Sequence, residues 1–114
     1  MRIPLVAANW KMNGTLDETG QLIKAMRPGL DALAGVEVVI CPPAMAITVA
    51  RVAVKGSAIK LGVQNIFHED RGAYTGEISA LMFKGVCDYV IAGHSERRLY
   101  FHEDDAAVNR KLKA

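Results

Sequence analysis

The sequence lacks the features that mark secreted, membrane-spanning and nucleic-acid-binding proteins. Two cysteines in 114 residues and no secretory signal predict a reduced, cytoplasmic protein without structural disulfides. Asn9 and Lys11 interrupt the apolar opening, and no run approaches the roughly 18 uncharged apolar residues that a membrane helix needs. A net charge of +2, with no basic or acidic tail, argues against nucleic acid as a partner.

Hydrophobic residues are abundant, at 51% of the chain against 23% charged residues. This balance can supply a core and makes intrinsic disorder a poor explanation. A length of 114 residues suits one domain and is short for two. We therefore expect residues 1–114 to form a single unit.

Four short apolar runs rich in β-branched residues are spread along the chain. Their starts lie 32, 23 and 30 residues apart, close to the length of a βαβ repeat. The runs are apolar at consecutive positions, which is typical of parallel strands buried on both faces. The expected strands are Pro4–Ala8, Val36–Ile40, Ile59–Val63 and Tyr89–Ala92.

Helical signals fill the gaps between these runs. A capping-box pattern from Thr15 to Glu18 predicts a helix start, and Pro28 predicts a kink or a split in that helix. The later helices are expected to begin at the Pro42–Pro43 pair, to cover Ile78–Lys84, and to run from about Glu103 to Lys113.

Four consecutive strand–helix units predict an α/β fold with parallel strands and right-handed crossovers. Such a repeat forms either a small doubly wound sheet or half of an eight-stranded barrel, and composition does not decide between them. A half barrel standing alone exposes both edge strands and its inner face.

Polar residues gather where the expected strands end, and this edge of a parallel sheet is where α/β proteins place their chemistry. By alternation, Asn9 and Lys11 point to the same side, where they could hold an anion or a carbonyl group. The plainer alternative is that Lys11 extends into solvent. Gln64 and Asn65 follow the third run in the same way.

His94 follows the fourth run and stands beside a predicted helix start. Positive charge is disfavoured there, so a neutral imidazole could donate a hydrogen bond to a carbonyl oxygen that gains negative charge. The alternative is a hydrogen-bonded core histidine. Glu96 is either a general acid/base beside His94 or, as we prefer, a fixed carboxylate paired with Lys11 or an arginine. Ser95 is predicted to cap the helix.

The segment Gln64–Glu77 is a 14-residue connection without periodicity. Loops of this length in compact domains are usually functional or interaction loops. Its tip, Arg71–Gly76, combines glycines with a tyrosine, which suits a docking surface.

Taken together, the polar segments resemble the first, third and fourth loop motifs of the triosephosphate isomerase family, in that family's order and spacing. The match runs along essentially the whole chain, and the combination of motifs is highly specific. The segments are Ala8–Asn13, Gln64–Asn65, Gly72–Glu77 and Ala92–Arg98.

The resemblance implies that residues 1–114 are the first four strand–helix units of a (β/α)8 TIM barrel, because a whole barrel needs about 250 residues. It implies an isomerase of glycolysis and gluconeogenesis that interconverts dihydroxyacetone phosphate and glyceraldehyde 3-phosphate through an enediolate. It also implies a triose phosphate as substrate, a homodimer, and no cofactor or metal ion.

Carried over residue by residue, the resemblance assigns five positions. Asn9 and Lys11 resemble the substrate-binding pair, with Lys11 stabilising charge on the substrate and the enediolate. His94 resembles the neutral electrophile that polarises the carbonyl group. Glu96 resembles the carboxylate that supports these groups. Thr75 resembles the tip residue of the loop that enters the partner subunit's active site.

The family's general-base glutamate, its lid and its phosphate-binding amides come from later strands than these. Proton abstraction needs a base within hydrogen-bond reach of the substrate carbon, so residues 1–114 alone are expected to be inactive. The alternative is a non-catalytic half-barrel module that self-associates or docks on a complementary chain.

Overall fold

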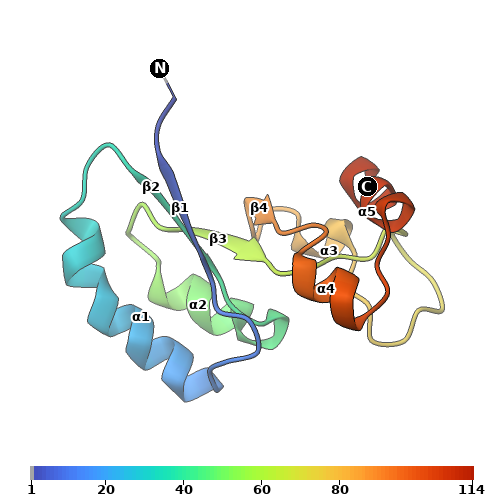
Figure 1. Cartoon of the computed structure of the whole chain (residues 1–114). Coiled ribbons are helices and arrows are strands. Elements are labelled where there is room, and N and C mark those ends of the chain that lie inside the picture. The colour runs from blue at the N-terminus through green and yellow to red at the C-terminus, as the bar shows by residue number, and fades with distance from the viewer. Residues whose placement is uncertain (1) are drawn as a thin grey trace.

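The computed structural model describes residues 2–114, which form a curled sheet of four parallel strands with helices packed against it (Figure 1). The strands lie side by side in chain order, each hydrogen-bonded to the next. The elements are β1 (Leu5–Asn9), α1 (Leu16–Asp31), β2 (Glu37–Cys41), the 3-10 turn η1 (Ala44–Ala46), α2 (Ile47–Ala53), β3 (Lys60–Val63), α3 (Ala80–Phe83), β4 (Tyr89–Val90), α4 (Ser95–Tyr100) and α5 (Asp105–Lys113).

This strand order decides between the two predicted architectures. A doubly wound sheet reverses its strand order at a switch point, whereas these four strands run β1-β2-β3-β4 without reversal. The prediction of an α/β fold made of the first half of a barrel is confirmed, and each predicted strand is present with its ends shifted or shortened.

The strands are staggered along one another, as curling into a barrel requires. Lys60, the first residue of β3, is level with Val39, the third residue of β2, and Tyr89, the first residue of β4, is level with Gly62, the third residue of β3. Gly62 separates Cys41 from Tyr89, and a Cβ built on Gly62 would lie 2.6 Å from the Cys41 sulfur. A side chain at position 62 would therefore push this row of the sheet apart.

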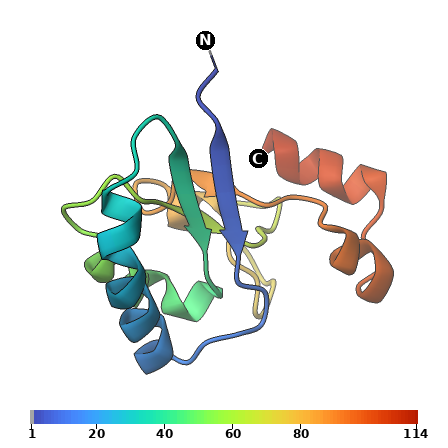
Figure 2. The ribbon, with the colours of Figure 1, turned by 60° about the vertical axis from the view of Figure 1, so that its left-hand side comes forward.

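The central strands and the first two helices form the main core. α1 and α2 lie together on one face of the sheet, as Figures 1 and 2 both show. Ile23 of α1 and Ile40 of β2 are almost completely buried, and burying such a side chain stabilises a fold by about 1.5–3 kcal/mol. The buried cluster is Ile23, Ile40, Ala50, Val54, Ile59 and Leu61.

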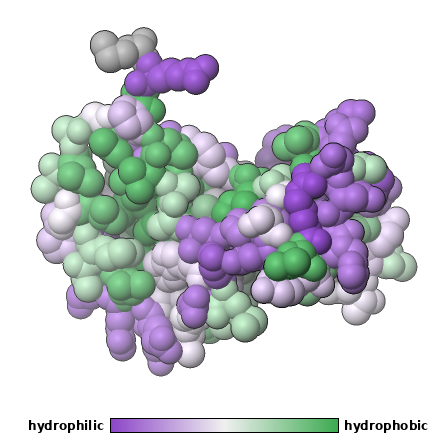
Figure 3. Space-filling model, viewed as in Figure 1, coloured by the Kyte–Doolittle hydropathy of each residue, from purple (hydrophilic) through white to green (hydrophobic). Residues whose placement is uncertain are grey.

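The edge strands β1 and β4 differ from the central ones. Leu5, Val6 and Val90 remain 47%, 56% and 44% exposed, and Figure 3 shows hydrophobic surface on this side of the molecule. The prediction that all four strands are buried on both faces is wrong for β1 and β4, because each has a neighbouring strand on one side alone. The expectation that a half barrel leaves its edges uncovered is confirmed.

The helix signals gave the start of α1 and were less accurate elsewhere. The chain after the Pro42–Pro43 pair first forms the 3-10 turn η1, and α2 begins only at Ile47. Thr15 caps α1 by accepting from the Glu18 amide at 3.2 Å, and α1 continues past Pro28 instead of splitting there. α3 is a single turn, shorter than the predicted helix over 78–84. None of the helices in residues 2–114 combines the length and hydropathy needed to cross a membrane.

Candidate functional site at the carboxyl ends of the strands

A hollow of about 270 Å³ lies at the carboxyl ends of β1, β3 and β4. Polar side chains from three separate parts of the chain meet there, although up to 87 residues of sequence separate them. The lining includes Asn9, Lys11, Gln64, Asn65, His94 and Glu96. The structure therefore brings together every predicted site residue except Thr75.

Lys11 is held in an uncommon backbone conformation directly after β1. Its φ is +55°, in the left-handed region that costs a residue with a side chain about 1–2 kcal/mol. The side-chain oxygen of Asn9 accepts a hydrogen bond from the Lys11 amide at 2.9 Å, which closes an Asx turn. The Lys11 ammonium lies 2.6 Å from Glu96 Oε1, so the lysine is directed across the hollow and not simply into solvent.

His94 sits on a turn that requires glycine before it. Gly93 has a φ of +69°, and a Cβ there would lie 2.8 Å from Val108 of α5. The Nδ1 atom of His94 accepts a hydrogen bond from the Glu96 amide at 3.0 Å, so a neutral imidazole carries its proton on Nε2. His94 thus caps α4; the expectation that Ser95 does so was wrong, since Ser95 is the first residue of the helix.

Glu96 pairs with the Lys11 ammonium through one oxygen and lies near His94 with the other. Besides the contact between Oε1 and Lys11, Oε2 lies 3.7 Å from His94 Nδ1. The hydrogen bond from Lys11 lowers the pKa of Glu96, against a smaller effect of burial that raises it. The carboxylate is therefore charged at neutral pH and paired with the Lys11 ammonium.

Thr75 does not line the hollow of its own chain. It lies exposed at the tip of the long connection between β3 and α3. Next to it, the ring of Tyr74 packs on the ring of Phe67 with 4.4 Å between centroids, which gives the exposed tip a fixed support.

Sequence reasoning missed a buried ionic cluster beneath the hollow. Glu103 Oε2 accepts hydrogen bonds from Lys111 at 2.8 Å and from Arg97 at 2.9 Å. Lys111 also donates to Asn65 at 2.7 Å. Burial disfavours charge on Glu103, but the two hydrogen bonds outweigh it and lower the pKa of its carboxyl group. Glu103 and Lys111 lie in the segment that the sequence predicted as the last helix, and nothing local showed that they would be buried.

Gln64 was recognised as part of a motif but was given no role of its own. Its side-chain nitrogen donates to the backbone carbonyl groups of Lys11 and Cys41, each at 2.9 Å. The available signal was its place as a polar residue directly after an apolar strand. Its hydrogen-bond partners, Lys11 and Cys41, lie far away in the sequence, so this signal could not identify them.

The two thiols are poor candidates for chemistry. Burial raises the pKa of the Cys87 thiol to about 11 and also raises that of Cys41, so neither offers much thiolate, the reactive form, at neutral pH. Within residues 2–114, no three His, Cys, Asp or Glu side chains are grouped so that they could hold a metal ion.

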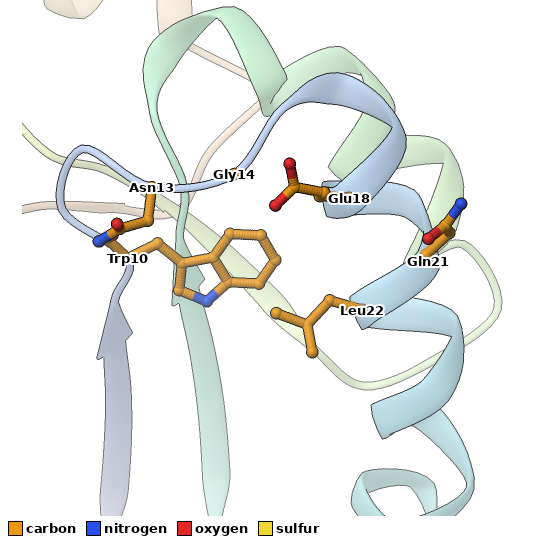
Figure 4. A pocket seen from close by; sticks show the side chains of 6 residues that line it. All are labelled: Trp10, Asn13, Gly14, Glu18, Gln21 and Leu22. Carbon is orange, nitrogen blue, oxygen red and sulfur yellow. The ribbon is translucent and has the colours of Figure 1, made fainter.

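A second hollow, of about 570 Å³, lies away from these polar groups (Figure 4). It opens between the β1–α1 loop and α1, where the Trp10 indole faces Leu22, with Glu18 and Gln21 at its side. None of the residues that line it belongs to the group of Asn9, Lys11, His94 and Glu96 around the first hollow.

The chain matches known proteins along almost its whole length. The family model described as triosephosphate isomerase matches residues 4–114. The chain belongs to the triosephosphate isomerase family.

Curated triosephosphate isomerases match along the entire chain. The protein from Dehalococcoides mccartyi is 50% identical over 114 residues, which are 100% of this chain and 45% of that protein. The protein from Moorella thermoacetica is 52% identical over 115 residues and is covered to 46% of its length. The chain thus spans about half the length of the curated relatives it matches.

A solved structure agrees with the arrangement of the strands and helices. A crystal structure of triosephosphate isomerase from Bartonella henselae superimposes with a TM-score of 0.90 at 42% sequence identity. The match covers 99% of this chain and 47% of that one. The four staggered strands therefore correspond to half of a TIM barrel.

Proposed function

We propose that this chain carries one half of the active site of an isomerase that interconverts dihydroxyacetone phosphate and glyceraldehyde 3-phosphate. The observation that supports it most is the convergence of Lys11, His94 and Glu96 on one hollow, from the ends of the two edge strands. Family membership supplies the reaction class, and the geometry supports a role for each residue.

In this proposal, Lys11 and His94 act on the same oxygen of the substrate. Removal of a proton next to a carbonyl group moves negative charge onto the carbonyl oxygen. The Nε2–H of a neutral His94 would donate a hydrogen bond to that oxygen, and the Lys11 ammonium would stabilise the charge. Asn9 would contact substrate through its amide nitrogen, since its oxygen is bound to the Lys11 amide.

The general base would come from outside residues 1–114. Glu96 is the carboxylate that lines the hollow, and its ion pair with Lys11 leaves it a weak base. The family resemblance places the basic glutamate on a later strand, together with a lid and phosphate-binding amides. We therefore propose that residues 1–114 form one incomplete barrel unit whose other half completes both the wall and the chemistry.

We further propose that the tip at Thr75 meets a second barrel in a homodimer. Thr75 is exposed, and the neighbouring Tyr74 is 43% exposed on a loop braced by Phe67. An exposed aromatic ring on a supported loop is typical of a residue that packs against a partner.

A coupled isomerase assay tests the proposed function. The chain is assayed alone and after refolding with a polypeptide made of the part of the Moorella thermoacetica relative that follows the matched region. We expect activity in the mixture and none in either component. Activity in the isolated chain would refute the argument about the missing base.

A stable complex of the two pieces without activity would refute the proposed chemistry itself. Size-exclusion chromatography before the assay separates this result from a failure to assemble. As a control, the carboxyl-terminal piece is assayed alone, and it should show no turnover.

A second candidate function is a non-catalytic module that associates with copies of itself. The exposed apolar side chains on β1 and β4 favour it, because both unpaired edges can accept a parallel strand. Sedimentation velocity on the isolated chain distinguishes the two: a folded monomer argues against self-association, and a stoichiometric dimer supports it.

A further inference from the structure

We infer that Gln64 is a positioning residue for Lys11: its side-chain amide holds the strained Lys11 peptide in place from the carbonyl side. The inference takes the role of Lys11 from the proposed function and adds a residue to which no role was assigned. It rests on hydrogen bonds that join Gln64, directly after β3, to Lys11, which follows β1, and to Cys41 of β2.

The Lys11 peptide is bound on both sides by side-chain amides. Asn9 accepts from the Lys11 N–H at 2.9 Å, and Gln64 donates to the Lys11 carbonyl oxygen at 2.9 Å. The positive φ of Lys11 is unfavourable for a residue with a side chain, so such a conformation persists only where its surroundings hold it. Two hydrogen bonds, one to each end of the residue, provide that restraint.

Gln64 also anchors this restraint to the central sheet. The same side-chain nitrogen donates to the Cys41 carbonyl oxygen at 2.9 Å, and that oxygen accepts the Trp10 amide at 3.1 Å. Gln64, directly after β3, thus ties the Lys11 carbonyl to the end of the β1–β2 hydrogen-bond ladder. Both protons of one NH2 group are used, so a side chain without two donors at this length cannot replace it.

Restraint of the backbone matters because the Lys11 side chain is long and half exposed. Its ammonium meets Glu96 at 2.6 Å, with side chains 52% and 43% exposed, and an ion pair so exposed is too weak to fix a flexible lysine by itself. The direction of the lysine is therefore set at its peptide. Without Gln64, we expect the residue to leave the positive-φ conformation and the ammonium to move away from Glu96.

Carbon-13 NMR titration of the glutamate carboxyl groups tests this inference on the 114-residue chain, without substrate. The variants are Gln64→Met, which keeps length and lacks donors, and the matched control Gln21→Met on the exposed face of α1. We expect the pKa of Glu96 to rise toward its ordinary value in Gln64→Met and to stay unchanged in Gln21→Met. The carboxyl group of Glu103 should keep its lowered pKa in both.

An unchanged pKa of Glu96 in folded Gln64→Met would overturn the inference. A rise at Glu96 accompanied by a rise at Glu103 would also overturn it, because it would indicate general loosening. If Gln64→Met does not fold, the uncharged variant Gln64→Ala serves instead; failure of both variants to fold makes Gln64 a folding residue and overturns the inference as well.

The same variant separates this inference from the proposed function. In the reconstituted mixture, misplacing Lys11 should lower kcat by about a hundredfold. The pKa of Glu96 could rise in Gln64→Met while even the parent mixture shows no activity. That result would support the role of Gln64 and refute the proposed isomerase site. Full activity of the Gln64→Met mixture would show that the Lys11 position does not depend on Gln64.

Discussion

The central strands and the edge strands of this sheet carry different parts of the protein's chemistry. Val39 and Ile40 of β2 and Leu61 of β3 are no more than 3% exposed. β1 and β4 are largely open to solvent, yet the loop after β1 carries Lys11 and the helix after β4 carries Glu96. Stability is concentrated in the middle of the sheet, and the proposed catalytic groups follow its two edges.

This difference shows why half of a site can be well formed in half of a barrel. The ion pair between Lys11 and Glu96 joins the loop after the first strand to the helix after the fourth, across 85 residues of sequence. The side chains of Lys11 and Glu96 thus contact each other directly, although β1 and β4 each have a neighbouring strand on one side alone. This contact is therefore present in the half barrel, without a closed ring of strands.

The largest expected effect concerns the edge-strand loops. In the reconstituted mixture, Lys11→Ala and His94→Ala should each lower kcat by about a hundred- to a thousandfold, because each removes a group that faces developing negative charge. The coupled assay measures this loss. The matched control is Lys60→Ala, an exposed lysine at the start of central strand β3, which should leave kcat unchanged; a similar loss there would break the division between edge and centre.

The buried cluster that links the end of β3 to α4 and α5 should give the largest loss of stability. Glu103→Gln leaves the buried ammonium of Lys111 without its counter-charge, and breaking such a pair costs about 3–5 kcal/mol. Urea unfolding followed by circular dichroism measures the free energy of unfolding. Glu69→Gln, in the exposed part of the long loop, is the control and should cost under about 0.5 kcal/mol.

A matched pair of valines compares the two kinds of strand directly. Val39→Ala on β2 should reduce the free energy of unfolding by about 2–3 kcal/mol, because it removes two buried carbons and leaves a cavity. Val6→Ala on β1, at a residue 56% exposed, should cost under about 0.5 kcal/mol. In the reconstituted mixture, the cost of Val6→Ala should rise; equal costs in the isolated chain would contradict the exposure of β1.

The smallest effect is a pH dependence at the rim. The folded chain lowers the pKa of Glu96 below its unfolded value, so the pair with Lys11 stabilises the fold above the ordinary glutamate range and loses its effect as pH falls through the folded pKa. The free energy difference between the parent and Glu96→Gln should shrink across that acid range. His94 also faces Glu96, so the series is repeated with Lys11→Met, where the pH-dependent difference should largely vanish.

Much of the fold could be predicted from the sequence because its signals are local. Apolar runs placed the strands, and Thr15 with Glu18 placed the start of α1. The apolar run at β1 did not itself show that the strand is exposed, since such a run has the same appearance whether or not its second neighbour is present; that expectation came from the half-barrel architecture. The length of α3 also depended on tertiary context.

The residues that line the candidate site could be predicted from the sequence, whereas many of the contacts between them could not. The Asn9–Lys11 and His94–Glu96 motifs came from the resemblance and from their places after the strands. The choice of Lys11 as the partner of Glu96 required the curvature of the sheet, whereas the cap of α4 by His94 is a contact between residues two apart. Lys111 lies 46 residues from Asn65 in sequence, and no local pattern could show that the two side chains meet.

The strand order described above has a consequence for how the protein is made. Because neighbours in space are neighbours in sequence, each strand that leaves the ribosome finds its template already in place, and the wall can grow in the direction of synthesis. The β1 edge is the exception: it has no strand on its other side, so Leu5 and Val6 stay exposed after all four strands have paired.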